Sequence, residues 1–175
     1  MTYKIIRPMG LLFILLFVAN FSGCFYSFTG ASVAPHLKTV AIPMAEDRSG
    51  IGELNLREQF TSKLIQAFNN DNTLRVAEKS SADALLECTI VSFNDAPAVI
   101  AAAGNNRENV ATRRITITAR VVFRDLVKKK TISEKNYSNY GDYTTDNIAA
   151  NRPVGIQTAL DRLTEDILIG TVSNW

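Results

Sequence analysis

The sequence predicts an α+β fold, with two helices packed on one face of a mixed, mostly antiparallel sheet of four strands, or five if a short second strand stays separate. Two segments repeat apolar side chains at helical spacing, one near the start of the domain and one at its end. Between them, segments alternate apolar and polar side chains as strands do. Helices at both ends of a run of hairpins are typical of an α+β domain. The expected strands are residues 38–43, 73–77, 84–93, 110–124 and 131–143, and the expected helices are residues 53–69 and 152–172.

The first expected strand ends at Pro43, and a loop rich in turn residues follows. The first helix is predicted by apolar side chains that recur every four residues, and four Asn and Asp residues at 69–72 end it. Residues 96–104 either extend the third strand or form a tip before a turn at Gly104. The last helix is expected to begin at Arg152, after a polar lead-in at residues 146–153. The apolar positions of the first helix are Leu56, Phe60, Leu64 and Phe68, and those of the last helix are Ile156, Leu160, Leu163 and Ile167.

The strand at residues 110–124 shows the clearest alternation. Five side chains are expected to face the core: Ile115, Ile117, Ala119, Val121 and Phe123. Five others are expected to face water or a partner: Thr116, Thr118, Arg120, Val122 and Arg124. In the preceding strand, Cys88 alternates with polar residues on the apolar side, which predicts a buried thiol without a disulfide partner.

The N-terminus predicts a secreted lipoprotein. Lys4 and Arg7 precede an apolar stretch at residues 9–21, which is too short for a comfortable membrane span and fits a signal peptide. The small residues before Cys24 resemble a lipobox, so we expect cleavage before Cys24 and acylation of its thiol, palmitate included. Phe25 after the cysteine is compatible with sorting to the outer membrane. The expected organisation is a signal peptide at 1–23, a lipidated tether at 24–37 and one domain at 38–175.

Charge and composition narrow the function classes. Two of the 19 basic residues lie in the signal peptide, which leaves 17 to balance the 17 acidic residues. A balanced domain argues against a nucleic-acid partner, because such domains carry a basic excess. His36, the only histidine, lies in the expected tether, and no Cys/His cluster or glycine-rich phosphate loop is present. We therefore expect no enzyme, no metal and no cofactor, although a carboxylate pair brought together by folding stays open.

Basic residues gather at the two expected hairpin turns. Arg107, Arg113 and Arg114 surround one turn, and Lys128, Lys129 and Lys130 form the other. Arginine and lysine at such positions grip the phosphates of an anionic amphiphile, or else they form a solvated surface or protect a strand edge. Tyr137, Tyr140 and Tyr143 lie close together on the last strand and serve either an interface or internal packing.

Several stretches together resemble the LptE-like lipoproteins of the Bacteroidetes and Chlorobi type. They are the start of the mature chain at residues 24–32, the first strand at 38–43, the hairpin at 114–118, the segment at 140–143 and the ending at 173–175. The resemblance covers nearly all of the mature chain, and it depends on the order and spacing of motifs that are individually weak.

This resemblance implies a lipoprotein that partners and plugs the LptD β-barrel during lipopolysaccharide transport and assembly at the outer membrane. It also implies two helices on a mixed four-stranded sheet. The six basic residues at the turns are then candidate lipopolysaccharide contacts. The first strand, the following helix and residues 82–85 are also similar to CsgG-like and TolB N-terminal-like domains. Another periplasm-facing assembly or secretion lipoprotein is therefore the alternative.

Overall fold

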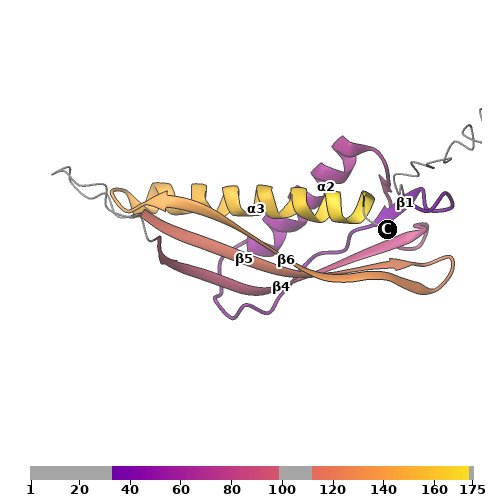
Figure 1. Ribbon diagram of the computed structural model, residues 1–175, viewed down its shortest axis with the longest axis horizontal. Coiled ribbons are helices and arrows are strands. Elements are labelled where there is room, and N and C mark those ends of the chain that lie inside the picture. The colour runs from indigo at the N-terminus through magenta and orange to yellow at the C-terminus, as the bar shows by residue number, and fades with distance from the viewer. Residues whose placement is uncertain (1–32, 99–111, 174–175) are drawn as a thin grey trace, which may run out of the picture. The chain divides into compact units, whose positions relative to one another are not determined.

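The computed structural model describes residues 33–98 and 112–173, which belong to the unit Ala31–Trp175 (Figure 1). The expected lipidation site Cys24, the candidate contact Arg107 and the expected turn at Gly104 lie outside the described residues. The elements follow in the order β1 (Thr39–Ala41), β2 (Glu46–Asp47), α2 (Leu56–Asp71), β3 (Arg75–Val76), β4 (Ala84–Pro97), β5 (Thr112–Asp125), β6 (Lys130–Thr144) and α3 (Ile148–Val172).

One mixed sheet of six strands forms a layer, with the order β3-β1-β4-β5-β6. β1 pairs in parallel with β3 and β4, and β2 also pairs in parallel with β4. β4, β5 and β6 form two long antiparallel pairs that run the length of the sheet (Figure 1). The predicted fold class is confirmed. The sheet has one strand more than the sequence predicted. The additional strand is β2, which was not predicted because its two residues are too few to show any alternation.

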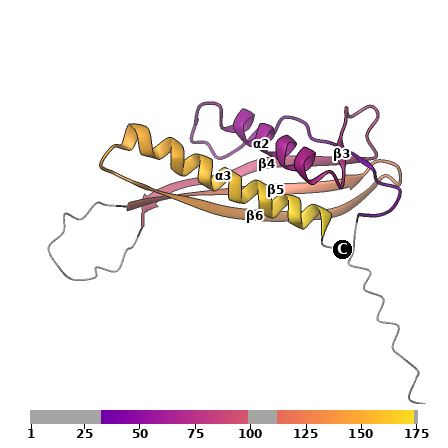
Figure 2. The same cartoon turned by 90° about the horizontal axis from the view of Figure 1, so that it is seen from above.

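The core lies between the sheet and the helices, which cover the same face (Figures 1 and 2). β5 turns every second side chain towards them, and all five side chains predicted to face the core are buried. The four apolar positions predicted for the first helix are buried on α2. Cys88 is buried as predicted, and burial raises the pKa of its thiol to about 12. A thiol so hard to ionise is a packing group and not a nucleophile.

α3 begins earlier than the sequence indicates. The expected polar lead-in at residues 146–153 is wrong, because the helix starts at Ile148 and includes Pro153. The Asn147 side chain accepts a hydrogen bond from the Ala150 N–H at 3.3 Å and so caps the first turn. Pro153 removes one intrahelical hydrogen bond near the start of a 25-residue helix, which the rest of the helix tolerates.

The packed chain also begins earlier than residue 38. Val33 and Leu37, which the sequence placed in the tether, are buried in the core. They are isolated apolar residues in a stretch rich in Pro, Ser and Gly, so no periodicity marks them as core. The last part of the expected tether therefore belongs structurally to the domain.

α3 approaches β6 closely because glycine stands on both elements. A Cβ added to Gly141 on β6 would lie 2.0 Å from the Gly155 carbonyl oxygen and 2.9 Å from the Ala159 nitrogen. Both atoms belong to the backbone of α3, so they cannot move aside as the end of a side chain can. The glycine at position 141 thus sets how near α3 lies to the sheet.

Replacing Gly141 by alanine is therefore expected to destabilise the domain by about 2–3 kcal/mol, because α3 must shift away from β6. Urea unfolding followed by circular dichroism measures the change. Asn136→Ala, at an exposed position of the same strand, is the control and should change stability by less than about 0.5 kcal/mol. Equal stability of the two variants would contradict the close approach.

Candidate functional site

The sheet face opposite the helices carries charged side chains, among them Arg120 and Arg124, which were predicted to point outward. Arg114, Arg120 and Arg124 alternate along β5 on this face. Each pairs with a carboxylate of a neighbouring strand: Arg114 with Asp142 at 2.7 Å, Arg120 with Glu134 at 2.5 Å, and Arg124 with Glu87 at 3.3 Å. The outward arginines are thus already engaged, and the face is polar with its charges largely balanced in cross-strand pairs.

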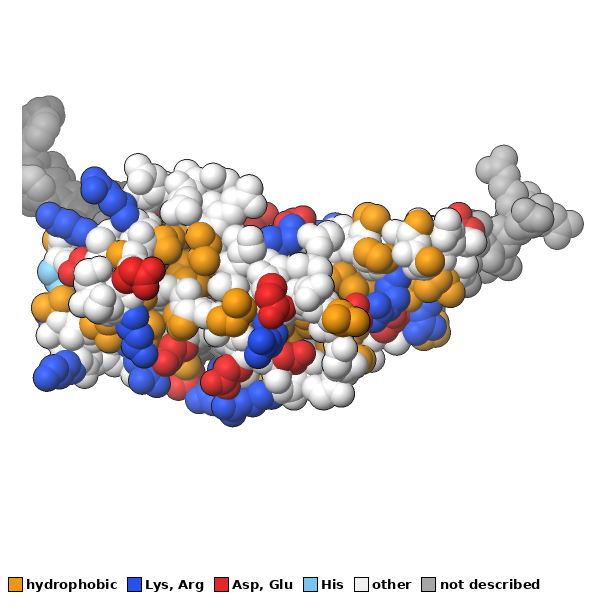
Figure 3. Space-filling view, turned by 180° about the vertical axis from the view of Figure 1, so that it is seen from behind, with side chains coloured by type: hydrophobic (Ala, Val, Ile, Leu, Met, Phe, Trp, Pro, Cys, Tyr) orange, Lys and Arg blue, Asp and Glu red, His pale blue; other side chains and the backbone are white. Residues whose placement is uncertain are grey.

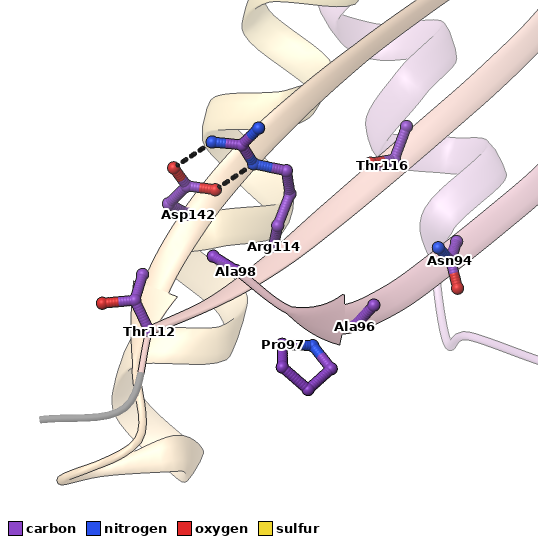
Figure 4. A pocket seen from close by; sticks show the side chains of 8 residues that line it. All are labelled: Asn94, Ala96, Pro97, Ala98, Thr112, Arg114, Thr116 and Asp142. Carbon is purple, nitrogen blue, oxygen red and sulfur yellow. Dashed lines mark hydrogen bonds and ion pairs between the residues drawn. The ribbon is translucent and has the colours of Figure 1, made fainter. Parts of the chain in front are cut away.

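A pocket lies on this face near the start of β5 (Figure 4). Arg114 crosses it and donates two hydrogen bonds to the Asp142 carboxylate, at 2.7 and 2.9 Å. These bonds lower the pKa of Asp142. The Arg114 guanidinium also lies 3.8 Å from the centroid of the Tyr140 ring. The pocket is lined by Asn94, Ala96, Pro97, Ala98, Thr112, Arg114, Thr116 and Asp142.

Arg113, although adjacent to Arg114, points to the opposite face. Its guanidinium donates to Asp95 at 2.8 Å and to the Tyr143 hydroxyl at 3.1 Å. Arg152 of α3 reaches the same Asp95 at 3.2 Å and also pairs with Glu53 at 2.7 Å. We call these five residues the Asp95 network. It joins β4, β5, β6, α3 and the loop before α2 at one end of the domain.

The three candidate lysines lie at the other end of β5. Lys128, Lys129 and Lys130 are exposed in the β5–β6 turn, where Lys129 has a φ of 52°. β5 has 14 residues, so about 45 Å separates this turn from the arginines, at about 3.3 Å per residue. The six basic residues predicted as lipopolysaccharide contacts therefore do not form one site. The described ones form two separate groups. Arg113 and Arg114 already pair with carboxylates at one end of β5, and the three lysines lie at the other end.

The three tyrosines also divide between the faces. The Tyr143 hydroxyl donates to Asp95 at 2.9 Å, and its ring is buried. Tyr137 packs against Gly170 of α3, where an added Cβ would lie 2.2 Å from the Tyr137 hydroxyl oxygen. Tyr140 is the outward one, 39% exposed, with Arg162 of α3 on its ring as well. Two of the three thus pack under α3, and Tyr140 faces out.

His36 has a structural partner that sequence spacing did not reveal. Its Nε2 lies 2.7 Å from the Asp125 carboxylate at the end of β5. Burial raises the pKa of Asp125, but hydrogen bonds from the Lys128 backbone N–H and from His36 outweigh burial and lower it. The pair joins the segment before β1 to the β5–β6 turn. A serine or cysteine nucleophile is not among the hydrogen-bond partners found for His36 in the described residues.

Within residues 33–98 and 112–173, no three His, Cys, Asp or Glu side chains are placed to hold a metal ion. In those same ranges, neither helix is both long and apolar enough to cross a bilayer. The charged groups pair across the sheet and around α3 instead of converging in a deep cleft. Fold and surface together define a small α+β domain whose outward charges, in the residues that the structure describes, are largely held in cross-strand pairs.

Comparison with known families identifies the class of this domain. The family model described as lipopolysaccharide-assembly, LptE, matches residues 37–169. The chain therefore belongs to the LptE family, as the sequence motifs indicated. This is a family of assembly lipoproteins and not of enzymes. No curated protein matches the sequence.

Solved structures support the fold alone, because their identities are low. Protein XCC0632 from Xanthomonas campestris is 11% identical with a TM-score of 0.56, and the match covers 81% of this chain and 89% of that one. The hypothetical protein CT253 from Chlamydia trachomatis is 11% identical with a TM-score of 0.55, over 75% of this chain and 94% of that one.

The Asp95 network makes the folding stability of the domain depend on pH in the acidic range. Burial raises the pKa of Asp95, but hydrogen bonds from Arg113, Tyr143 and Arg152 outweigh burial and lower it. A lowered folded-state pKa means that the ionised network stabilises the domain above the ordinary value of about 3.9, and that this stabilisation disappears as the pH falls through the lowered value.

Asp95→Asn is therefore expected to lower stability at pH 7 and to flatten the decline of stability below about pH 4. Urea midpoints measured across that range test both parts. Glu165→Gln removes an exposed carboxylate of α3 outside the network and serves as the control. A decline as steep in Asp95→Asn as in the wild type would show that other carboxylates govern acid unfolding.

Proposed function

We propose that this protein is an outer-membrane lipoprotein that partners and plugs an LptD β-barrel in lipopolysaccharide transport and assembly. Membership of the LptE family over residues 37–169 is the observation that carries the proposal. In this proposal the signal peptide is removed, Cys24 is acylated, and the domain faces the periplasm or the barrel lumen. Catalysis, metals and cofactors have no part in it.

The shape of the domain supports a plug. β4, β5 and β6 have 14, 14 and 15 residues, which correspond to about 45–50 Å at about 3.3 Å per residue. That length exceeds the apolar band of an outer-membrane barrel, which is about 25 Å tall. The lumen of such a barrel is polar, and the outward sheet face meets it with charges already paired. A body of this kind fills a wet lumen without burying unpaired charge.

Affinity purification of the tagged, acylated protein from detergent-solubilised outer membranes tests this proposal. We expect a large LptD-type barrel at roughly equal stoichiometry, identified by mass. The mass of the purified protein also reports whether Cys24 carries acyl chains. Recovery of a secretion pore in place of that barrel would overturn the proposal in favour of another envelope-assembly lipoprotein of the CsgG-like or TolB N-terminal-like kind.

Lipopolysaccharide contact by the basic turn residues is a second part of the proposal. Because the two groups lie at opposite ends of β5, each is tested separately. The arginine end lies farther from the segment that leads to Cys24, which suits a lipid that is moving towards the outer leaflet. We assign the lipopolysaccharide contact to Arg107, Arg113 and Arg114. The guanidinium groups of Arg113 and Arg114 already hold carboxylates and can exchange them for phosphates.

Changing these three arginines to Gln is expected to weaken lipopolysaccharide binding about tenfold or more, since each lost charge-assisted hydrogen bond to phosphate is worth about 1.5–3 kcal/mol. Light scattering or surface plasmon resonance with immobilised protein measures the binding. Lys128→Gln, Lys129→Gln and Lys130→Gln together form the comparison and should leave it within about twofold. Undiminished binding by the arginine variant would remove this part of the proposal.

A further inference from the structure

One end of the domain carries a group of exposed cations that the sheet register brings together. Thr39 pairs with Arg75, Val40 with Ala84, Ala84 with Asp125, and Asp125 with Lys130. Lys38 precedes Thr39, and two more lysines precede Lys130 in the turn. We call this group the basic end: Lys38, Arg75, Lys128, Lys129 and Lys130, all exposed.

The basic end differs from the other charged surfaces in its pairing. The arginines of β5 and Arg152 each contact a carboxylate. In the described residues, none of the five side chains of the basic end takes part in an ion pair. Two carboxylates lie among them but pair with none of their side chains: Asp83 accepts from the backbone N–H groups of Lys38 and Thr39 and from the Thr39 hydroxyl, and Asp125 accepts from the Lys128 backbone N–H and contacts His36. Five positive charges are thus left facing outward at one end.

The chain enters the domain at this same end. Val33 and Leu37 are buried, and the 2.7 Å contact between His36 and Asp125 holds the segment between them to the end of β5. Figures 1 and 2 both show the first described residues beside the β5–β6 turn. Val33 lies nine positions after Cys24 in the sequence, and a chain of that length reaches at most about 30 Å. Whatever surface holds Cys24 therefore lies within that distance of the segment at the basic end.

An exposed apolar side chain stands among the lysines. Val127 directly precedes Lys128 in the β5–β6 turn and is 59% exposed. Figure 3 shows Lys and Arg side chains gathered at the end marked by the histidine, with hydrophobic side chains beside them. An exposed apolar side chain next to a run of lysines suits the boundary between headgroups and acyl chains, where the lysines remain at the phosphates and the apolar group enters.

We propose that the basic end binds the anionic glycerophospholipid headgroups of the membrane leaflet that holds the N-terminal anchor. The inference rests on the proposed function only for the acylation of Cys24. It fixes an orientation: the β5–β6 turn lies on the leaflet surface, Val127 inserts among the headgroups, and the Asp95 network lies at the far end of the sheet. Lysine contacts of this kind are additive and sensitive to salt.

Vesicle sedimentation with the full mature chain tests the proposal. Cys24→Ser removes the acyl anchor, so the remaining binding reports the folded surface. We expect binding to vesicles of phosphatidylcholine mixed with phosphatidylglycerol, loss of that binding at high salt, and little binding to phosphatidylcholine alone. Changing Lys128, Lys129 and Lys130 to Gln should weaken binding to the anionic vesicles about a hundredfold, since each of the three lysines near such a surface is worth about 1 kcal/mol.

A matched variant controls for net charge. Arg48→Gln, Arg57→Gln and Lys135→Gln remove three charges at exposed positions away from the basic end and should bind within about twofold of the unsubstituted surface. Equal losses in the two variants would overturn the proposal, as would wild-type affinity in the lysine variant. A lysine variant that loses lipopolysaccharide binding as strongly as vesicle binding would also overturn it, by assigning the turn to the transported lipid.

A second measurement follows the insertion of the apolar side chain directly and leaves every charge of the protein in place. Val127→Trp, in a chain with Trp175→Phe, leaves one indole, whose emission should shift to shorter wavelength with anionic vesicles. Leu54→Trp, at an 82% exposed position before α2, is the control and should not shift. A shift at position 54 alone would place the wrong end on the membrane. Neither assay needs the barrel or the acyl chains, so a negative pull-down and a negative vesicle result are distinguishable.

Discussion

The register of β5 between β4 and β6 is the constraint on which the rest of the structure depends. Side chains of a strand alternate with a period of two, so a slip of one residue would exchange the faces of all 14 positions. In the observed register the apolar positions meet the helices, and Arg114, Arg120 and Arg124 meet carboxylates on both neighbouring strands. Core packing and cross-strand charge pairing therefore favour the same register, and each strengthens the other's specificity.

An irregularity in β4 then assembles the Asp95 network. Strict alternation from Ile90 would place Asp95 on the outward face, away from α3. The register shifts between Ile90 and Ser92, so Val91 becomes an extra residue and Phe93 and Asp95 turn inward. Arg113 lies on the same side, and Arg152 arrives from α3, so three charged groups meet where a regular strand would have left an unpaired arginine. A bulge of one residue thus brings Asp95 to the side of the sheet where it pairs with Arg113 and Arg152.

Sequence patterns predicted the periodic parts of the fold because many residues contribute to each signal. The apolar face of α2, the inward face of β5 and the burial of Cys88 were all predicted from spacing and confirmed. What the patterns missed depends on single residues or long-range contacts. The Asn147 cap starts α3 within an apparently polar loop, and His36 meets Asp125 across 89 positions of sequence. That Arg113 and Arg114 face opposite sides of the sheet follows from strand alternation alone. The pairing of Arg113 with Asp95 also requires the bulge in β4, which the sequence pattern does not reveal.

The two ends of the domain differ in whether their cations pair with carboxylates, and this difference bears on which end binds a moving lipid and which end stays on a membrane. At the Asp95 end, each described arginine has a carboxylate, so a phosphate must compete with an existing partner. At the basic end, the lysine side chains form no ion pair among the described residues, so a phosphate need not displace a carboxylate from them. Arginines that can exchange a carboxylate for a phosphate suit transient contact with a transported lipid. Lysines without an ion-pair partner suit lasting contact with a membrane surface. The first described residues lie beside these unopposed lysines, so in the proposed orientation the acyl anchor and the membrane-bound surface would be at the same end, with the exchangeable contacts about 45 Å away along β5.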